Sequence, residues 1–322
     1  MKNIRYELLR QSVTTTEKRG LVRLSEQCFP SSSYKPNVSS TEGYWDAQLR
    51  LLSSSSHGLY AVYMGEVVGV GLYKLVSKKY NLWELYHIGV LEEFRGRGIA
   101  TSVVRSIIGK ISSLGGVRVY LSVDEDNEPA IRSYRRNGFQ ELFSFVHFKL
   151  SSAESFSGTP LVQPLGKLGN FEVLGRRQYR VFWMLFRHHY RKLSDFMGYC
   201  EKTFHDMSST DNFPKGYSPL SYLYYKENQP CHALVNGWVD HQNHTAYITE
   251  LISVNLQTTD WQTFFQECLS YLHEIGVNDV SIRVNTKLGD YYDLISYSSR
   301  EQGYEVVEVS KTKVMMGNKQ LT

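Results

Sequence analysis

The chain has 322 residues, and a length of this order favours two domains over one. Apolar residues make up 42% and charged residues 21%, a globular composition that excludes a disordered or collagen-like chain. No apolar run approaches the roughly 20 residues needed to cross a bilayer, and the amino-terminal residues alternate charged and apolar side chains instead of forming a signal peptide. We therefore expect a cytoplasmic protein with no membrane partner.

Charge and cysteine content exclude two further classes. The net charge is +4 with both signs interspersed, and the basic cluster at 187–192 is interleaved with histidine and tyrosine and has no base-reading motif, so no nucleic-acid partner is expected. The cysteines are scattered and form no CxxC pair, so the sequence predicts no metal site and no disulfide framework. They are Cys28, Cys200, Cys231 and Cys268.

The first half of the chain alternates strand-like and helix-like patterns. In chain order these predict a strand over 4–13, helices over 14–28 and 41–52, strands over 59–64 and 67–76, a strand over 83–91, a helix over 99–113, a strand over 117–123, a helix over 129–136 and a strand over 139–150. The connection Gly65-Glu66 predicts a tight antiparallel hairpin.

The second half repeats this order after a segment rich in serine, glycine and proline. The patterns predict a strand over 179–186, a helix over 189–204, strands over 221–226, 231–239 and 247–254, a helix over 261–276 and a strand over 280–284. A repeat of half the chain length indicates duplication and not a solenoid. We expect domains over 1–150 and 171–322, joined by a linker over 151–170.

A glycine-rich turn separates the strand over 83–91 from the helix over 99–113. It reads Arg95-Gly96-Arg97-Gly98-Ile99-Ala100. Such a turn directs backbone N–H groups at an anion, and the helix dipole adds positive potential. The spacing matches neither GxGxxG nor GxxxxGK[ST]. The turn therefore predicts a phosphate site of another kind.

These residues resemble the GCN5-related N-acetyltransferase (GNAT) superfamily. Arg95, Gly98 and Ala100 match its signature of Arg or Gln, two residues, Gly, one residue, and Gly or Ala. The segment WELYHIGVLEEF is similar to the family's fourth strand and NEPAIRSYRRNGF to its second cofactor motif. The resemblance implies an α/β (α+β) fold of two tandem domains, each a mixed, mostly antiparallel sheet flanked by helices, with acetyl-CoA as co-substrate and no metal.

The resemblance also implies which residues hold the cofactor. The backbone from Gly96 to Thr101 would cradle the pyrophosphate, and two residues of the preceding strand would hydrogen-bond the pantetheine arm. The cofactor-binding set is Ile88, Val90, Arg95, Gly96, Arg97, Gly98, Ile99, Ala100, Thr101, Asn127 and Tyr134.

Three residues are catalytic candidates. Tyr134 would protonate the leaving thiolate, because a phenol with a pKa of about 10 is neutral at pH 7 and can donate. Glu84 is our first candidate base, since a glutamate in an apolar strand needs a function or a salt-bridge partner. His87 is the second, with a reference pKa near 6.5. Strand parity puts Glu84 and His87 on opposite faces unless a bulge at Gly89 intervenes.

The second half departs from the family's pattern at its cofactor loop. It reads NLQTTDWQTF, without either glycine and with Asp260 where the phosphates would lie, and Ser299 stands at the position that corresponds to Tyr134. We therefore expect a degenerate carboxyl-terminal domain with no cofactor loop of its own.

The reading that we favour is an N-acetyltransferase for a primary amine of a small molecule, with the second domain walling the substrate channel. Its tandem form resembles mycothiol synthase and the self-resistance acetyltransferases that inactivate paenilamicin, edeine or zwittermicin. A protein lysine or amino terminus as acceptor, and an acyl-CoA-sensing binding protein, are the alternatives. Internal duplication favours a monomer over a homodimer.

Overall fold

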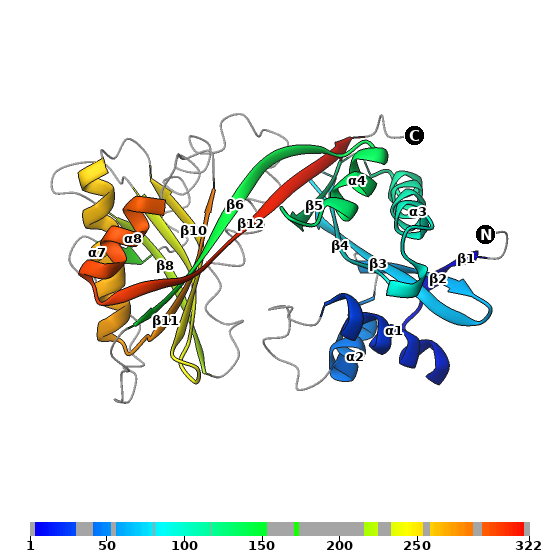
Figure 1. Ribbon diagram of the computed structural model, residues 1–322, viewed down its shortest axis with the longest axis horizontal. Coiled ribbons are helices and arrows are strands. Elements are labelled where there is room, and N and C mark those ends of the chain that lie inside the picture. Colours follow the sequence, from blue (N-terminus) through cyan, green and yellow to red (C-terminus); the bar gives the residue numbers. More distant parts are fainter. Residues whose placement is uncertain are drawn as a thin grey trace. The chain divides into compact units, whose positions relative to one another are not determined.

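The computed structural model describes two compact units. The first is Met1–Leu142 with Lys313–Thr322, and the second is Phe143–Thr312. The described residues are 4–29, 41–52, 56–79, 81–116, 118–152, 171–173, 216–224, 233–253, 258–285 and 292–318. Each unit is a mixed sheet flanked by helices, as predicted (Figure 1). No helix in this described part is long and apolar enough to cross a membrane.

The first unit follows the predicted order of elements. They are β1 (Ile4–Leu9), α1 (Thr15–Cys28), α2 (Thr41–Leu51), β2 (Ser56–Tyr63), β3 (Glu66–Ser77), β4 (Leu82–Val90), the short helix η1 (Glu92–Phe94), α3 (Ile99–Ser113), β5 (Arg118–Asp124) and α4 (Glu128–Arg136). β1 ends four residues before the predicted end of the strand. Thr14 caps α1 at the predicted start of the helix, in a reciprocal capping box with Glu17. η1 was not predicted.

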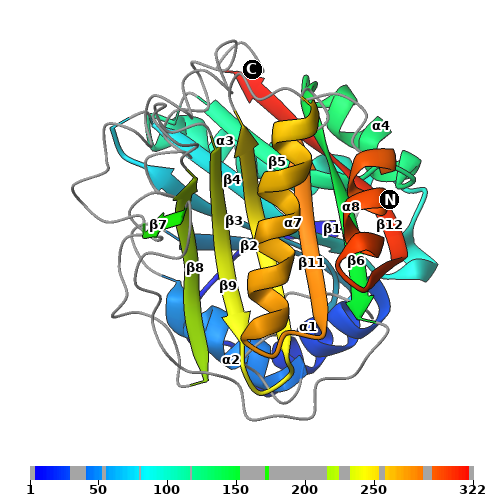
Figure 2. The ribbon, with the colours of Figure 1, turned by 90° about the vertical axis from the view of Figure 1, so that its left-hand side faces the viewer.

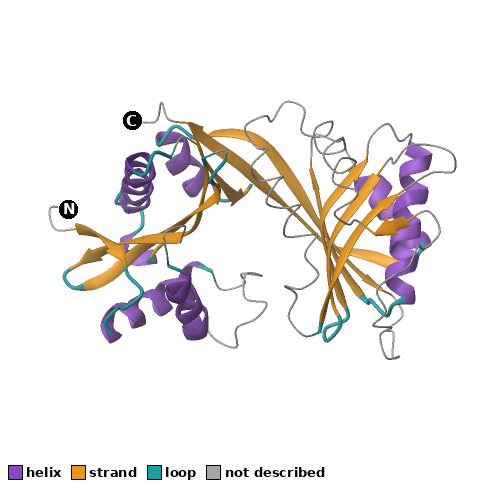
Figure 3. Cartoon of the chain, turned by 180° about the vertical axis from the view of Figure 1, so that it is seen from behind, coloured by secondary structure: helices purple, strands orange, loops and turns teal. Residues whose placement is uncertain are grey.

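Helices cover both faces of the first unit's sheet. α1 and α2 lie on one face and α3 on the other, with α4 beside α3 (Figures 1 and 3). The strand order is β1-β2-β3-β4-β5-β12, and β4 and β5 are parallel. α3 buries its apolar stripe, as its periodicity predicts, through Val103, Val104, Ile107, Ile108 and Ile111.

β12 (Tyr304–Asn318) contributes its last residues to the first unit. Met315 is part of the first unit's apolar core. Lys313 lies 3.2 Å from Glu141 and 3.7 Å from Glu125. The first unit is therefore discontinuous in sequence, with its two segments separated by the whole second unit.

The second unit has the strand order β12-β6-β11-β10-β9-β8-β7, with α7 lying along one face (Figure 2). Its elements are β6 (Gln140–Ser152), β7 (Phe171–Val173), β8 (Tyr217–Tyr224), β9 (Ala233–Asp240), β10 (Thr245–Ser253), α7 (Thr258–Glu274), β11 (Asp279–Asn285), α8 (Tyr292–Glu301) and β12. The predicted strand over 179–186 and helix over 189–204 lie outside the described residues, as does nearly all of the predicted linker. The predicted domain limits stay a prediction.

Gly71 of β3 lies against two side chains of α3. A Cβ atom added there would lie 2.6 Å from Cδ1 of Ile107 and 2.9 Å from Cγ1 of Val103. Both distances are too short for carbon atoms in contact, so the α3 face of β3 requires glycine at this position.

His147 of β6 is a half-buried histidine of the second unit. It lies opposite Arg283 of β11 in the antiparallel register. Burial, with the nearby Arg283 charge, lowers the pKa of His147 to about 4. Among the described residues, its buried Nε2 has no hydrogen-bond partner. The fold therefore holds this ring in the neutral form.

Gly71→Ala should destabilise the chain by about 1–3 kcal/mol, because the added methyl group overpacks the contact with α3. Gly109→Ala is the matched control, since a Cβ atom there meets nothing within 4 Å and alanine is the better helix former. Urea denaturation measures both. Equal urea midpoints for Gly71→Ala and the wild type would contradict this packing.

The neutral state of His147 predicts a dependence of stability on pH. Since the unfolded ring titrates near pH 6.5 and the folded ring near 4, the unfolded chain binds more protons between these values. The contribution of His147 to the free energy of unfolding is therefore full above about pH 6.5, and it is lost as the pH falls towards 4. His147→Gln removes it, so the drop in Tm between pH 7.5 and pH 5 should be smaller in the variant. An unchanged drop would show that His147 does not contribute.

Candidate active site

β4 and β5 part in the middle of the first unit's sheet. They pair only from Leu82 to Glu84 on β4 and from Arg118 to Tyr120 on β5. β4 continues to Val90 and β5 to Asp124. At about 3.3 Å per residue, residues 85–90 of β4 present an edge of about 20 Å that is not paired with β5. An extended ligand could pair with this edge as a strand would.

A β-bulge at His87 accompanies the parting. Val70 and Leu72 of β3 pair with Gly89 and Tyr86 of β4, so β4 carries one extra residue here. His87 has a φ of 53°, in the left-handed region that favours glycine. The bulge therefore lies at His87. The sequence analysis had placed it at Gly89, two residues later.

The bulge decides which face Glu84 and His87 share. Tyr86 contacts Gln48 of α2, and His87 contacts Ser25 of α1, so both side chains lie on the α1/α2 face. Glu84 precedes Tyr86 by two residues in the regular part of the strand and lies on the same face. The parity objection to having both candidate bases on one face is thereby removed.

Glu84 forms an ion pair across the sheet. Its Oε2 atom lies 2.9 Å from Nζ of Lys74, and the two side chains are 25% and 39% exposed respectively. Nζ of Lys74 is also 4.9 Å from the centre of the Tyr86 ring. The salt bridge weighed as an alternative for Glu84 is present, but the carboxylate remains partly accessible.

The ring of His87 is held by α1 and α2. Nε2 lies 3.1 Å from Oγ of Ser25, and Nδ1 lies 3.2 Å from Oη of Tyr44. Ser25 is buried and accepts a hydrogen bond of 2.8 Å from Nε1 of Trp45. The Phe29 ring lies 4.1 Å from the imidazole. Contacts on both nitrogens and on the ring offset the cost of the left-handed backbone.

The glycine loop has the conformation that an anion site needs. Gly96 and Gly98 have φ values of 74° and 77°, and a Cβ atom on either would meet nothing within 4 Å. Glycine is therefore required by backbone conformation and not by lack of space. Gly98 caps α3 without a side-chain acceptor, and the N–H groups from Ile99 to Thr101 lack intrahelical acceptors. A phosphate group could accept hydrogen bonds from them.

The two arginines of the loop have protein contacts. Nε of Arg95 donates to the carbonyl of Val90 at 3.1 Å, and the Cys28 thiol donates to the same oxygen at 3.3 Å. The guanidinium of Arg97 lies 5.3 Å from the Phe94 ring centre. Arg95 thus ties the loop to the end of β4.

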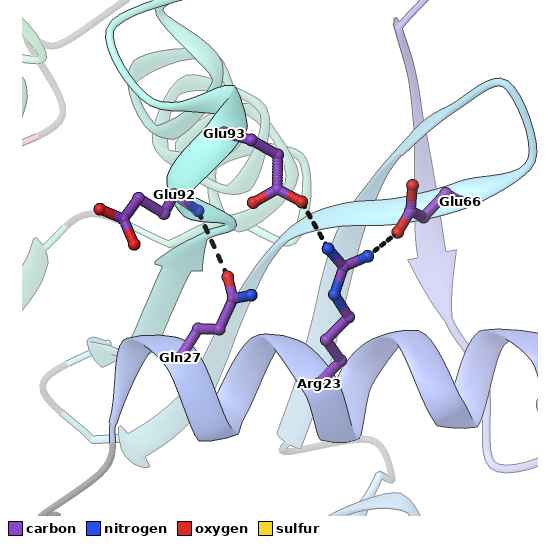
Figure 4. Close-up of polar contacts among 5 residues, drawn as sticks. All are labelled: Arg23, Gln27, Glu66, Glu92 and Glu93. Atoms are coloured by element: carbon purple, nitrogen blue, oxygen red, sulfur yellow. Dashed lines mark hydrogen bonds and ion pairs between the residues drawn. The ribbon is translucent and has the colours of Figure 1, made fainter.

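α1 anchors the segment that leads into the loop (Figure 4). Arg23 bridges Glu66 of β3 and Glu93 of η1, with 2.5 Å between Nη2 of Arg23 and Oε1 of Glu93. The side chain of Gln27 accepts a hydrogen bond from the backbone N–H of Glu92 at 3.4 Å. These contacts fix η1, and hence the start of the loop, against α1.

α4 carries the two remaining predicted residues. Burial raises the pKa of the Tyr134 phenol well above its usual range, and its hydroxyl has no hydrogen-bond partner among the described residues. Burial therefore holds the phenol in its neutral, protonated form at pH 7. Asn127 caps α4, and its side chain accepts from N of Ala130 at 3.3 Å. Oγ1 of Thr101 lies 2.9 Å from Oγ of Ser133, which joins α3 to α4.

The second unit has a similar parting, and there Arg283 of β11 contacts β10. β10 and β11 pair from Thr245 to Ile248 and from Asp279 to Ile282, and β10 then bulges at Thr249. Nε of Arg283 donates to the Thr249 carbonyl at 2.9 Å, and its Nη2 lies 2.7 Å from Oε1 of Glu250. At the corresponding point of β5, after the last paired residue, stands the apolar Leu121. Arg283 thus bonds to the backbone and to a carboxylate of β10 where β10 and β11 part, and the loss of a cofactor site in this unit stays a prediction.

Comparison with known proteins bears on these features. The model of the acetyltransferase (GNAT) family matches residues 19–139. The mycothiol acetyltransferase of Corynebacterium aurimucosum is 36% identical over 56 residues, which cover 17% of this chain and 18% of that protein. The spermine/spermidine N(1)-acetyltransferase of Bacillus subtilis is 34% identical over 90 residues, covering 26% and 57% respectively. The chain thus matches less than two thirds of the length of these relatives.

Solved structures resemble the chain along nearly its whole length. A GCN5-related N-acetyltransferase from Sphaerobacter thermophilus has a TM-score of 0.59 at 13% identity, covering 97% of this chain and 95% of that one. A tandem GNAT protein from the clavulanic acid biosynthesis pathway has a TM-score of 0.56 at 11% identity, covering 98% of both. The predicted tandem fold is thereby confirmed. The family model thus covers residues 19–139, and the fold of the whole chain resembles that of these structures.

Proposed function

We propose that the chain is an acetyl-CoA-dependent N-acetyltransferase that acts on a primary amine of a small molecule. One observation carries the proposal: the unpaired edge of β4 leads directly to the glycine-capped amino terminus of α3. The edge suits an extended arm with amide groups, and the helix terminus suits a pyrophosphate. Coenzyme A has both parts in this order.

The described residues fit that co-substrate. The backbone of Ile88 and Val90 would hydrogen-bond the pantetheine arm, and the N–H groups from Gly96 to Thr101 would bind the pyrophosphate. The carbonyl of Val90 already accepts bonds from Arg95 and Cys28. We therefore assign the N–H of Val90 and the backbone of Ile88 as the cofactor's partners. Arg95 and Arg97 add positive charge near the phosphates, while Asn127 orients the amino terminus of α4.

Proton transfers at this site use Glu84 and Tyr134. The acceptor amine arrives as an ammonium ion, and Glu84 removes its proton directly or through one water molecule. The amine then attacks the thioester carbonyl, and Tyr134 protonates the departing thiolate. His87 is the alternative base. Since both of its ring nitrogens are hydrogen-bonded, it would have to pass the proton through Ser25 or Tyr44.

The acceptor that we propose is a small cationic amine. Glu84 offers a negative charge and Tyr86 an aromatic ring, the two groups that recognise an ammonium ion. The names of the relatives, which include a spermine/spermidine N(1)-acetyltransferase and a mycothiol acetyltransferase, support an amine of this size. Self-resistance to an amine-bearing peptide antibiotic is the narrower form of the proposal, and such antibiotics belong among the acceptors to be assayed.

Gly98→Ala should weaken acetyl-CoA binding about tenfold. The free loop of the variant relaxes out of the left-handed conformation, and regaining it to bind costs alanine roughly 1–2 kcal/mol. Gly65→Ala is the matched control: Gly65 has a φ of 87° and equally open surroundings, but lies in the β2–β3 turn. Isothermal titration calorimetry measures both affinities. Similar losses of acetyl-CoA affinity in the two variants would show that the cofactor does not bind at Gly98.

Amine-dependent thiol release from acetyl-CoA tests the activity itself. The panel comprises polyamines, aminoglycosides, amine-bearing peptide antibiotics and lysine peptides, and we expect release with the small amines. Glu84→Gln should lower kcat by about a hundredfold or more with little change in acetyl-CoA affinity, since only the base is lost.

Acetyl-CoA binding with no thiol release across the panel would contradict an enzyme and favour an acyl-CoA sensor. Release with lysine peptides alone would contradict a small-molecule acceptor. An unchanged kcat in Glu84→Gln at saturating amine would move the role of base to His87.

A further inference from the structure

Lys74 places a primary amine beside the candidate base. Its Nζ is 2.9 Å from Oε2 of Glu84 and 4.9 Å from the centre of the Tyr86 ring. A carboxylate and an aromatic face are the surroundings that we assign to the ammonium group of the acceptor. Lys74 thus presents the same chemical group in the same surroundings as an external substrate would.

A pantetheine arm paired with β4 would place its thioester end near Glu84 and Lys74. The pyrophosphate site lies beyond the carboxyl end of β4, so a pantetheine arm paired with the strand runs back from Val90 towards Glu84. The unpaired edge of about 20 Å is comparable to the extended arm in length. β4 and β5 rejoin at Glu84 and Tyr120, and the arm can run no further along the edge. Its sulfur end therefore lies near Glu84, and Lys74 is the neighbour of Glu84 on β3.

We infer that Lys74 is a site of self-acetylation, which rests on the proposed acetyltransferase function. Glu84 takes one proton from the Lys74 ammonium group, and the freed Nζ attacks the thioester carbonyl carbon. A C–N bond forms, the C–S bond breaks, and the thiolate takes a proton from the Tyr134 hydroxyl. The second proton of Nζ passes through water to the Tyr134 phenolate and restores the phenol, and Glu84 returns its proton to solvent. The products are Nζ-acetyl-lysine at position 74 and free coenzyme A.

Pairing with carboxylates alone does not single out Lys74. Nζ of Lys18 lies 3.0 Å from Glu42 and 2.7 Å from Asp46, between α1 and α2. Lys313 likewise lies beside Glu125 and Glu141. The ion pairs of these two lysines do not involve β4. Lys74 differs from both in lying beside Glu84, where the unpaired edge of β4 begins. Lys18 and Lys313 are therefore internal references for non-enzymatic acetylation.

Acetylation of Lys74 changes the electrostatics of the acceptor site. The amide is neutral, so Glu84 loses its internal counter-ion and the Tyr86 ring loses its cation. The carboxylate becomes available to an external ammonium ion. The modified enzyme is therefore the form that binds a cationic amine most strongly.

The test incubates the full chain with acetyl-CoA labelled in its acetyl group, without any amine, and follows each lysine by peptide mass spectrometry. Label should reach one acetyl group at Lys74, at a rate independent of protein concentration and about tenfold or more above Lys18 and Lys313. Glu84→Gln should slow labelling of Lys74 by about a hundredfold. Gly98→Ala should slow it at subsaturating acetyl-CoA, and labelling of Lys18 should be unchanged in both variants.

Labelling of Lys74 no faster than Lys18, in a chain that releases thiol with an external amine, would overturn self-acetylation and leave the proposed function standing. Equal labelling of Lys74 in wild type and Glu84→Gln would show chemical acetylation and overturn it too. A rate that rises with protein concentration would exclude the intramolecular step. Absence of acetyl-CoA binding, of thiol release and of labelling together would refute the proposed function with it.

Discussion

The left-handed backbone of His87 is the constraint on which the first unit's site depends. A side chain at positive φ persists only where its surroundings fix it, and here Ser25, Tyr44 and Phe29 hold the imidazole from α1 and α2. The extra residue in β4 changes the parity of the strand at this point. Glu84, Tyr86 and His87 consequently face the same helices, while the edge of the strand beyond Glu84 lies free of β5.

The two units share an architecture, but different residues stand where their parallel strands separate. Both have a parallel pair of strands that separate after three or four residues next to a bulge. In the first unit, β5 continues with Leu121 after its last residue paired with β4. The glycine loop at 95–98 is exposed. In the second unit Arg283 is bonded to the carbonyl of the bulged Thr249 and to the buried Glu250. Because Glu250 is buried, removal of Arg283 would destabilise the second unit.

The sequence could predict those features that depend on local patterns. Apolar periodicity and capping residues predict the helices α1, α2, α3 and α4. The glycine motif predicts the positive φ of Gly98, a conformation that glycine adopts at low cost. The bulge was expected two residues too late, because its position depends on tertiary contacts of His87. The pairing of Lys74 with Glu84 depends on the β3–β4 register, which the bulge itself shifts. The return of Met315 to the first core has no local pattern at all.

That return has a consequence for the order of folding. Residues 313–318 are synthesised only after the whole second unit, yet Met315 packs in the core of the unit that is made first. During translation the first unit therefore lacks the strand that pairs beside β5 until the end of β12 has been synthesised. Loss of the strand's final residues would act on the candidate active site through an incomplete core, although no residue of the site is encoded there.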